Sequence, residues 1–146
     1  MAYALTQDIV DLHGEEFVLL IALRGEEDTL TDPLTAAAII DALAQASSEA
    51  DTYIVRRYPV PVTRPPRVLE MHVINMACHH LASTADRMTE IIRQRYEDAQ
   101  KWLINISKGI ADLPPGEDDD GNTIAEPSPS SATFSSAEPM FKRGGS

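Results

Sequence analysis

The residues best suited to metal chemistry gather in one stretch, which holds His72, Cys78, His79 and His80. Imidazole and thiolate are the usual protein ligands of zinc. Apolar periodicity places all four residues on one predicted helix. There His72 and His79 would stand about 10 Å apart along the axis, while His79 and His80 would point about 100° apart. One helix cannot close such a site by itself, so the sequence predicts no metal and no cofactor.

A second candidate is the acidic run 118–120, followed by Gly121, which has the composition of a calcium-binding loop. Such a loop has twelve residues, with glycine at the sixth position. That alignment puts Gly116 at the first position and Pro127 at the last, where carboxylates are needed. We therefore reject calcium binding.

Motifs of catalysis are absent from the sequence. There is no Gly-x-Ser-x-Gly, no glycine-rich phosphate loop and no His-Glu-x-x-His. The carboxylate pairs 15–16, 26–27 and 97–98 are neighbours in the chain, and no apolar pocket is evident that would separate their pKa values. The sequence predicts no catalytic residue and a protein that is not an enzyme.

The elements that would carry these residues are predicted from apolar spacing and cap residues. Five helices are expected, over residues 7–13, 15–23, 33–56, 67–81 and 90–108. Thr6, Asp32 and Thr89 are predicted N-caps, and Gly14 and Gly109 are predicted stops. Apolar residues make up 43% of the chain and aromatic residues only 5%, which favours an aliphatic core. The expected fold class is all-α, a compact bundle of about five helices.

Two of these helices have apolar faces that can be written out. The third helix is expected to bury Ala36, Ile39, Ile40, Leu43, Ala46, Ala50 and Ile54. The fifth helix has a similar stripe, on which Tyr96 and Trp102 lie, so both rings are expected in the core.

A proline-rich arm is predicted where the third helix stops. Prolines remove backbone donors and disfavour helix in the preceding residue, so residues 58–66 should be extended. Three arginines lie on or beside this arm. The predicted interface residues are Arg56, Arg57, Tyr58, Pro59, Pro61 and Arg64, joined by the apolar anchors Phe134, Met140 and Phe141 near the C-terminus.

Two regions are expected in the chain. Residues 1–109 should form one helical domain. Residues 110–146 are acidic and rich in Pro and Ser, without periodicity, and should form a tail that becomes ordered only on assembly. The lone Cys78 fits a reducing cytosol, and the apolar run 17–23 is too short to span a bilayer, so no membrane partner is expected.

Charge is distributed unevenly along the chain. Residues 1–55 carry 11 acidic and 1 basic side chains, residues 56–109 carry 5 and 9, and residues 110–146 carry 7 and 2. The net charges are −10, +4 and −5. Complementary patches steer association and fix its register, so this polarity suits a subunit whose acidic part meets a neighbour's basic part. Ordinary solvated helix faces would give the same counts, and that alternative stays open.

Two motifs carry a resemblance to a known family. Residues 49–61 read Glu-x-Asp-x-Tyr-Ile-x-Arg-Arg-Tyr-x-Val-Pro, and residues 95–109 read Arg-Tyr-Glu-Asp-Ala-x-x-Trp-Leu-x-x-Ile-x-x-Gly. With the opening 3–9 and the break at 14–16, they resemble the head–tail connector family of Mu-like phages and prophages. The likeness runs from about Tyr3 to Gly109, while His79-His80 and residues 83–86 depart from it.

The resemblance implies a structural role in the neck of the virion. Copies would form a homo-oligomeric ring beneath the portal protein with its twelvefold symmetry, and would dock the next neck or tail-completion protein. DNA would pass through the channel without sequence-specific binding. The subunit would occupy the host cytoplasm during assembly. Two alternatives remain, a cytosolic helical adaptor or assembly chaperone and a small helical DNA-binding regulator.

Overall fold

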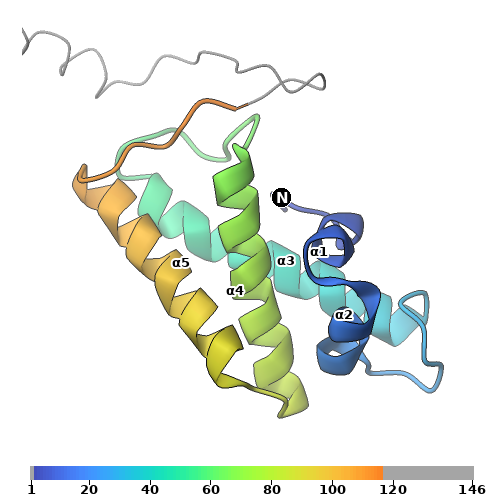
Figure 1. Ribbon diagram of the computed structural model, residues 1–146. Helices are drawn as coiled ribbons and strands as arrows, with labels where there is room; N and C mark the ends of the chain where they lie inside the picture. Colours follow the sequence, from blue (N-terminus) through green and yellow to red (C-terminus); the bar gives the residue numbers. More distant parts are fainter. Residues whose placement is uncertain (1, 117–146) are drawn as a thin grey trace, which may run out of the picture.

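The computed structural model describes residues 2–116 of the chain, and within that range the regular elements are five helices (Figure 1). They are α1 (Thr6–His13), α2 (Glu15–Ala22), α3 (Pro33–Ile54), α4 (Arg67–Ala85) and α5 (Glu90–Lys108). The predicted all-α bundle is confirmed. None of these helices is both long enough and apolar enough to cross a lipid bilayer.

Most helix ends follow the predicted cap chemistry. The Asp32 carboxylate accepts a hydrogen bond from the backbone N–H of Leu34 at 2.9 Å, which begins α3. The Thr89 hydroxyl accepts one from Ile92 at 3.2 Å, which begins α5. Gly14 and Gly109, with φ of 90° and 80°, end α1 and α5 in a conformation that favours glycine.

Four predicted helix ends differ from the structure, although α2 differs by one residue only, since it ends at Ala22. The N-cap of α1 is Leu5, because its backbone N–H donates to the Asp8 carboxylate at 2.7 Å and Thr6 is already helical. Helix α3 stops at Ile54, whose carbonyl accepts the N–H of Tyr58 at 2.9 Å and closes a tight turn. Helix α4 continues past the predicted end to Ala85, and Asp86, with φ of 57°, follows it in the left-handed conformation.

The centre of the bundle is α4. Six consecutive residues of this helix, 73–78, are buried, so it has contacts on every side. Figure 1 shows α5 alongside α4, α3 crossing behind it and the α1–α2 pair on the opposite side from α5. Helix α4 contacts all four of the others. The remaining helices are therefore arranged around one buried rod.

The buried stripe of α3 largely follows the prediction. Ile39, Leu43 and Ala46 are buried, as are Ala50 and Ile54. Ala36 is only half-buried. Ile40 is 59% exposed, so its assignment to the core was wrong: it lies one residue, about 100° of rotation, beyond Ile39.

Arg24 joins the ends of α2 and α4. Its guanidinium donates to the carbonyl of Ile21 at 2.9 Å and to that of Leu81 at 3.0 Å. A further bond from the same guanidinium reaches the Thr84 hydroxyl at 2.7 Å. The carbonyls near the C-terminal end of a helix carry partial negative charge, so a guanidinium between two such ends stabilises both.

Replacing Gly109 with Ala should destabilise the domain by about 1 kcal/mol, because the left-handed backbone is costly for a residue with a Cβ atom. Crowding is not the cause, since the nearest atom to that Cβ would be Arg57 Cζ at 3.8 Å. Urea unfolding followed by circular dichroism measures the change. Gly109→Asn should lose less, and the neighbouring Lys108→Ala should be nearly neutral. Equal stability of Gly109→Ala and the natural chain would contradict this account.

Candidate functional site

The proline-rich arm, residues 58–66, is anchored to the domain at several points. Val60 and Val62 are half-buried against the core. The Val62 backbone N–H donates to the hydroxyl of Tyr3 at 2.9 Å, and this hydroxyl in turn donates to the Asp51 carboxylate. Burial and the neighbouring Asp51 raise the pKa of Tyr3, so the hydroxyl keeps its proton. The arm is thus held between the N-terminal segment and α3.

Arg57 makes its contacts inside the chain. Its guanidinium donates to the carbonyls of Ile106 at 3.1 Å and Ala111 at 3.0 Å, and pairs with Asp112 at 2.8 Å. Only 14% of its side chain is exposed. The cation therefore closes the C-terminal end of α5, where helix carbonyls favour positive charge. Its predicted role in an interface with another molecule stays a prediction.

The segment 110–116 runs back along the arm. The backbone N–H of Leu113 donates to the hydroxyl of Tyr58 at 3.1 Å. Gly116 is buried against the arm, since a Cβ atom there would fall 2.2 Å from the carbonyl oxygen of Arg64. Figure 1 shows this segment in orange beside the green arm. The start of the predicted tail therefore contacts the helical domain. The rest of the tail, with Phe134, Met140 and Phe141, lies outside the described residues.

Four of the predicted interface residues remain open to solvent. Arg56, Pro59, Pro61 and Arg64 are all exposed, and they form what we call the arm-end surface. This surface is basic, and the contacts of Tyr3, Arg57 and Tyr58 hold its backbone in place. A fixed basic surface can offer charge to a partner without first losing much conformational freedom.

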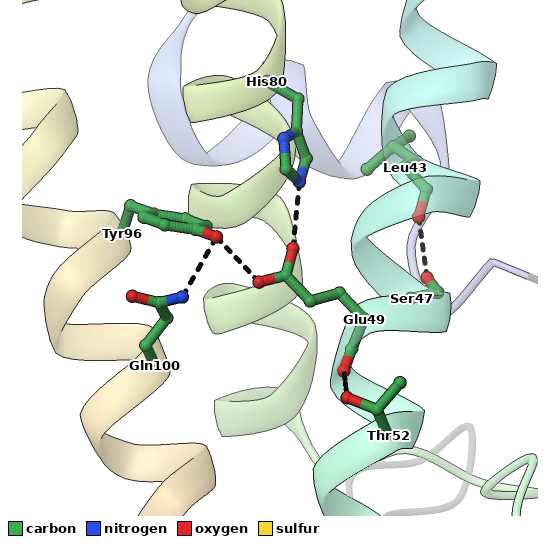
Figure 2. Close-up of polar contacts among 7 residues, drawn as sticks. All are labelled: Leu43, Ser47, Glu49, Thr52, His80, Tyr96 and Gln100. Atoms are coloured by element: carbon green, nitrogen blue, oxygen red, sulfur yellow. Dashed lines mark hydrogen bonds and ion pairs between the residues drawn. The ribbon is translucent and has the colours of Figure 1, made fainter.

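A polar cluster joins α3, α4 and α5, and the sequence did not reveal it. The carboxylate of Glu49 on α3 accepts hydrogen bonds from the Tyr96 hydroxyl at 2.7 Å and from His80 Nε2 at 3.2 Å (Figure 2). Gln100 donates to the Tyr96 hydroxyl at 3.1 Å. The Glu49 side chain is 23% exposed. Burial and the Glu49 carboxylate raise the pKa of Tyr96, which keeps the phenol in its donor form.

Stacked rings line the seam between α4 and α5. His79 stacks on Tyr96 with ring centroids 3.9 Å apart, and His72 stacks on Trp102 at 4.7 Å. Burial lowers the pKa of His72, partly offset by Asp98. Burial and His80 lower the pKa of His79. Both rings are therefore uncharged at neutral pH.

The side chains of the seam between α4 and α5 offer little for metal binding or for thiolate chemistry. Across residues 2–116, no group of three His, Cys, Asp or Glu side chains is placed to hold a metal ion. Cys78 is 3% exposed, and burial raises the pKa of its thiol to about 12, so little thiolate forms. The predicted calcium candidate, residues 118–121, lies outside the described residues. The arrangement of His79, His80 and Tyr96 holds helices together.

The two motifs noted in the sequence meet in space. Glu49 of the first motif binds Tyr96 of the second, and Arg57 of the first binds the carbonyl of Ile106 in the second. These contacts join the end of α3 and the arm to the length of α5. Glu49, Arg57 and Tyr96, polar residues of the two motifs, thus make contacts within this chain.

Comparisons with known proteins confirm the resemblance to a family of Mu-like phage proteins. The family model described as Bacteriophage Mu, Gp36 matches residues 3–132. Mu-like prophage FluMu protein gp36 of Haemophilus influenzae strain Rd is 34% identical over 122 residues, which cover 84% of this chain and 81% of that protein. Gene product J of Escherichia phage Mu is 33% identical over 95 residues, covering 61% and 66%.

Replacing Tyr96 with Phe should destabilise the domain by about 1 to 2 kcal/mol, because the half-buried Glu49 carboxylate loses a hydrogen bond. Thermal or urea unfolding measures the loss. Tyr53→Phe is the matched control: its ring is half-buried, and within residues 2–116 its hydroxyl has no hydrogen-bond partner, so the change should cost less than about 0.5 kcal/mol. Equal losses of stability in the two variants would refute the proposed contribution of the polar cluster to the free energy of unfolding.

Acid should destabilise the domain through three half-buried histidines. His13, His72 and His79 have lowered pKa values in the folded chain, so the unfolded state binds more protons. The free energy of unfolding that these uncharged histidines contribute is therefore fully present above the unfolded pKa of about 6.5. It is lost as the pH falls through and below that value. His72→Phe keeps a ring on Trp102 and cannot titrate, so its unfolding free energy should fall less between pH 7.5 and 5.5. Lys101→Gln is the control, and its unfolding free energy should change with pH as that of the natural chain does. If His72→Phe shows the same pH dependence as this control, His72 does not contribute to the acid sensitivity.

Proposed function

The chain belongs to the Bacteriophage Mu Gp36 family, and from that premise we propose that it is a structural subunit of the virion, a head–tail connector in the neck. Copies would form a ring beneath the portal protein, with the portal's twelvefold symmetry, and the ring would join the capsid to the tail. The next neck or tail-completion protein would dock on its far side. The subunit would act mechanically, by extending and sealing the channel through which DNA passes.

One observation carries this proposal, the separation of opposite charges at the two ends of α3. The loop before α3 exposes Glu26, Glu27 and Asp28, and the arm after α3 exposes Arg56 and Arg64. Helix α3 has 22 residues, so its ends lie about 33 Å apart. Figure 1 shows the loop and the arm at opposite ends of that helix.

Such polarity favours head-to-tail contact between copies. When the two complementary surfaces lie on different parts of one subunit, the contact is heterologous, and it produces a ring if the rotation closes. The acidic end of one copy would meet the arm-end surface of the next. Acidic residues left on the channel wall would repel the phosphates of passing DNA and keep it from binding.

The assembly contact can be tested with the full chain and the portal protein that is its proposed partner. Arg56→Glu and Arg64→Glu, made singly, should each weaken ring formation about tenfold, because each replaces an attraction with a repulsion. Both residues are exposed, so folding should be unaffected. Arg57 is avoided, since its contacts hold the end of α5. Sedimentation velocity and light scattering, with and without portal, measure the assembled fraction.

The control is Lys101→Glu, which makes the same charge change on an exposed position of α5 away from the arm. It should assemble normally. Assembly of the natural chain should also weaken between low and high salt, because salt screens exposed pairs. A chain that stays small with portal present would favour the assembly-chaperone alternative. Assembly insensitive to salt and to both arginine reversals would remove the electrostatic part of the proposal.

A further inference from the structure

An open apolar groove lies between the α1–α2 corner and the start of α5. It has a volume of about 380 Å³, and its lining includes Leu12, Phe17, Ile91 and Ile92. Leu12 is 46% exposed and Ile91 59% exposed. Single exposed apolar residues are ordinary on protein surfaces, but two large ones lining one groove indicate a place where another apolar group can be buried.

A cation without a counter-ion also lines this groove. Within residues 2–116, no carboxylate lies in ion-pair range of the Arg95 guanidinium, and its hydrogen-bond contact is His13 Nδ1 at 3.5 Å. Nearby Arg93, in contrast, pairs with Glu90 and Glu97 of its own helix.

The tautomer of His13 leaves this cation unneutralised. His13 Nε2 lies 3.0 Å from the amide oxygen of Asn75, so Nε2 carries the hydrogen and Nδ1 accepts from Arg95. A neutral imidazole offers no charge to compensate the guanidinium. The groove therefore suits a ligand that brings large apolar side chains together with a carboxylate.

The chain itself contains such a ligand. Near its C-terminus, Glu138 is followed after one proline by Met140 and Phe141. Of the six acidic side chains in residues 117–146, five lie within 117–126 and the sixth is Glu138, while the two basic side chains, Lys142 and Arg143, follow Phe141. Glu138 can supply the carboxylate that Arg95 lacks, and Met140 and Phe141 can supply the large apolar side chains.

The chain leaves the described structure far from its own groove. Gly116 lies beside Arg64 at the arm, next to the C-terminal end of α5, whereas the groove lies at the beginning of α5. With 19 residues, α5 is about 28 Å long. The 24 residues from Gly116 to Met140 can extend by at most about 80 Å, so a neighbouring copy is well within reach.

We propose that residues 138–141 of one copy dock in this groove of a second copy, with Met140 and Phe141 against Leu12 and Ile91 and with Glu138 paired to Arg95. The inference rests on the proposed self-association. Donor segment and acceptor groove start from opposite ends of the subunit, so each copy can fill the groove of the next without its tail returning along the length of α5. This contact is again heterologous and can continue around a ring.

Disulfide trapping between two full-length chains tests the contact. A tagged Ile91→Cys chain is mixed with an untagged Phe141→Cys chain under mild oxidation, and cross-linked dimer is followed on non-reducing gels. The natural Cys78 is buried and should not interfere. The control pairs Phe141→Cys with Leu20→Cys, a position on α2 that is 55% exposed and outside the groove lining. Trapping at Ile91 should be at least about tenfold faster than at Leu20.

A charge exchange tests the ion pair in the same assay. Arg95→Glu in the groove chain should slow trapping to the control rate, and Glu138→Arg in the tail chain should restore it. Circular dichroism of each variant checks that the helical fold is intact. Equal trapping at Ile91 and Leu20, or no rescue by the exchange, would overturn the proposed docking.

Two further measurements identify the chain that fills the groove and distinguish a failure of the docking proposal from a failure of the proposed connector function. A single chain carrying both Ile91→Cys and Phe141→Cys should form dimers and larger species that increase with concentration. Closure within one chain, at a rate independent of concentration, would overturn the second copy as occupant. If trapping fails while the natural chain still assembles on portal, the groove inference falls and the connector function stands. If trapping succeeds while the natural chain does not assemble on portal, the groove inference stands and the connector function falls.

Discussion

Burial of α4 on nearly its whole circumference is the constraint on which the rest of the structure depends. A rod with six consecutive buried residues, 73–78, must be covered from several directions, and the other four helices supply that cover. Some of its polar side chains then bond to the helices that cover it, since an unpaired buried polar atom is costly. The Nδ1 atoms of His72 and His79 have no hydrogen-bond partner within residues 2–116. Asn75 meets His13 of α1, and His80 meets Glu49 of α3. The arrangement of the helices around α4 and the hydrogen bonds between their side chains therefore depend on each other.

Polar contacts also fix the relative orientation of the helices, whose core is otherwise built from small aliphatic side chains. Such side chains tolerate many arrangements of similar energy, whereas hydrogen bonds require particular distances and angles. Glu49 can accept from Tyr96 and His80 together only when α3, α4 and α5 stand in one relative orientation. The stacked pairs of His79 with Tyr96 and His72 with Trp102 fix the same seam along its length.

The ends of the helices are tied by arginines in a way that bears on the proposed role. Arg24 joins the C-terminal ends of α2 and α4, and Arg57 joins the end of α5 to the segment that follows it. Because Arg57 and Tyr58 are occupied inside the domain, the arm between α3 and α4 presents Arg56 and Arg64 on a fixed backbone. A connector that repeats one contact around a ring would gain from such rigidity, since little order would remain to be acquired on binding.

The sequence by itself determined what depends on near neighbours in the chain. Helix type, the caps at Asp32 and Thr89, and the glycine ends at Gly14 and Gly109 follow from contacts within a few residues, and they were predictable for that reason. The errors at Thr6 and at the end of α4 are also local, where a neighbouring carboxylate or a left-handed residue moved the boundary.

Only the tertiary structure decided which side chains meet across the bundle. Tyr96 and Glu49 are 47 residues apart, and Arg57 and Ile106 are 49 apart, so no local spacing signals either contact. The sequence could mark Arg57 as a charge beside a proline arm, but its partners depend on where α5 ends in space. The exposure of Ile40 was decided in the same way, because the width of the buried face on α3 depends on how α4 and α5 pack against it.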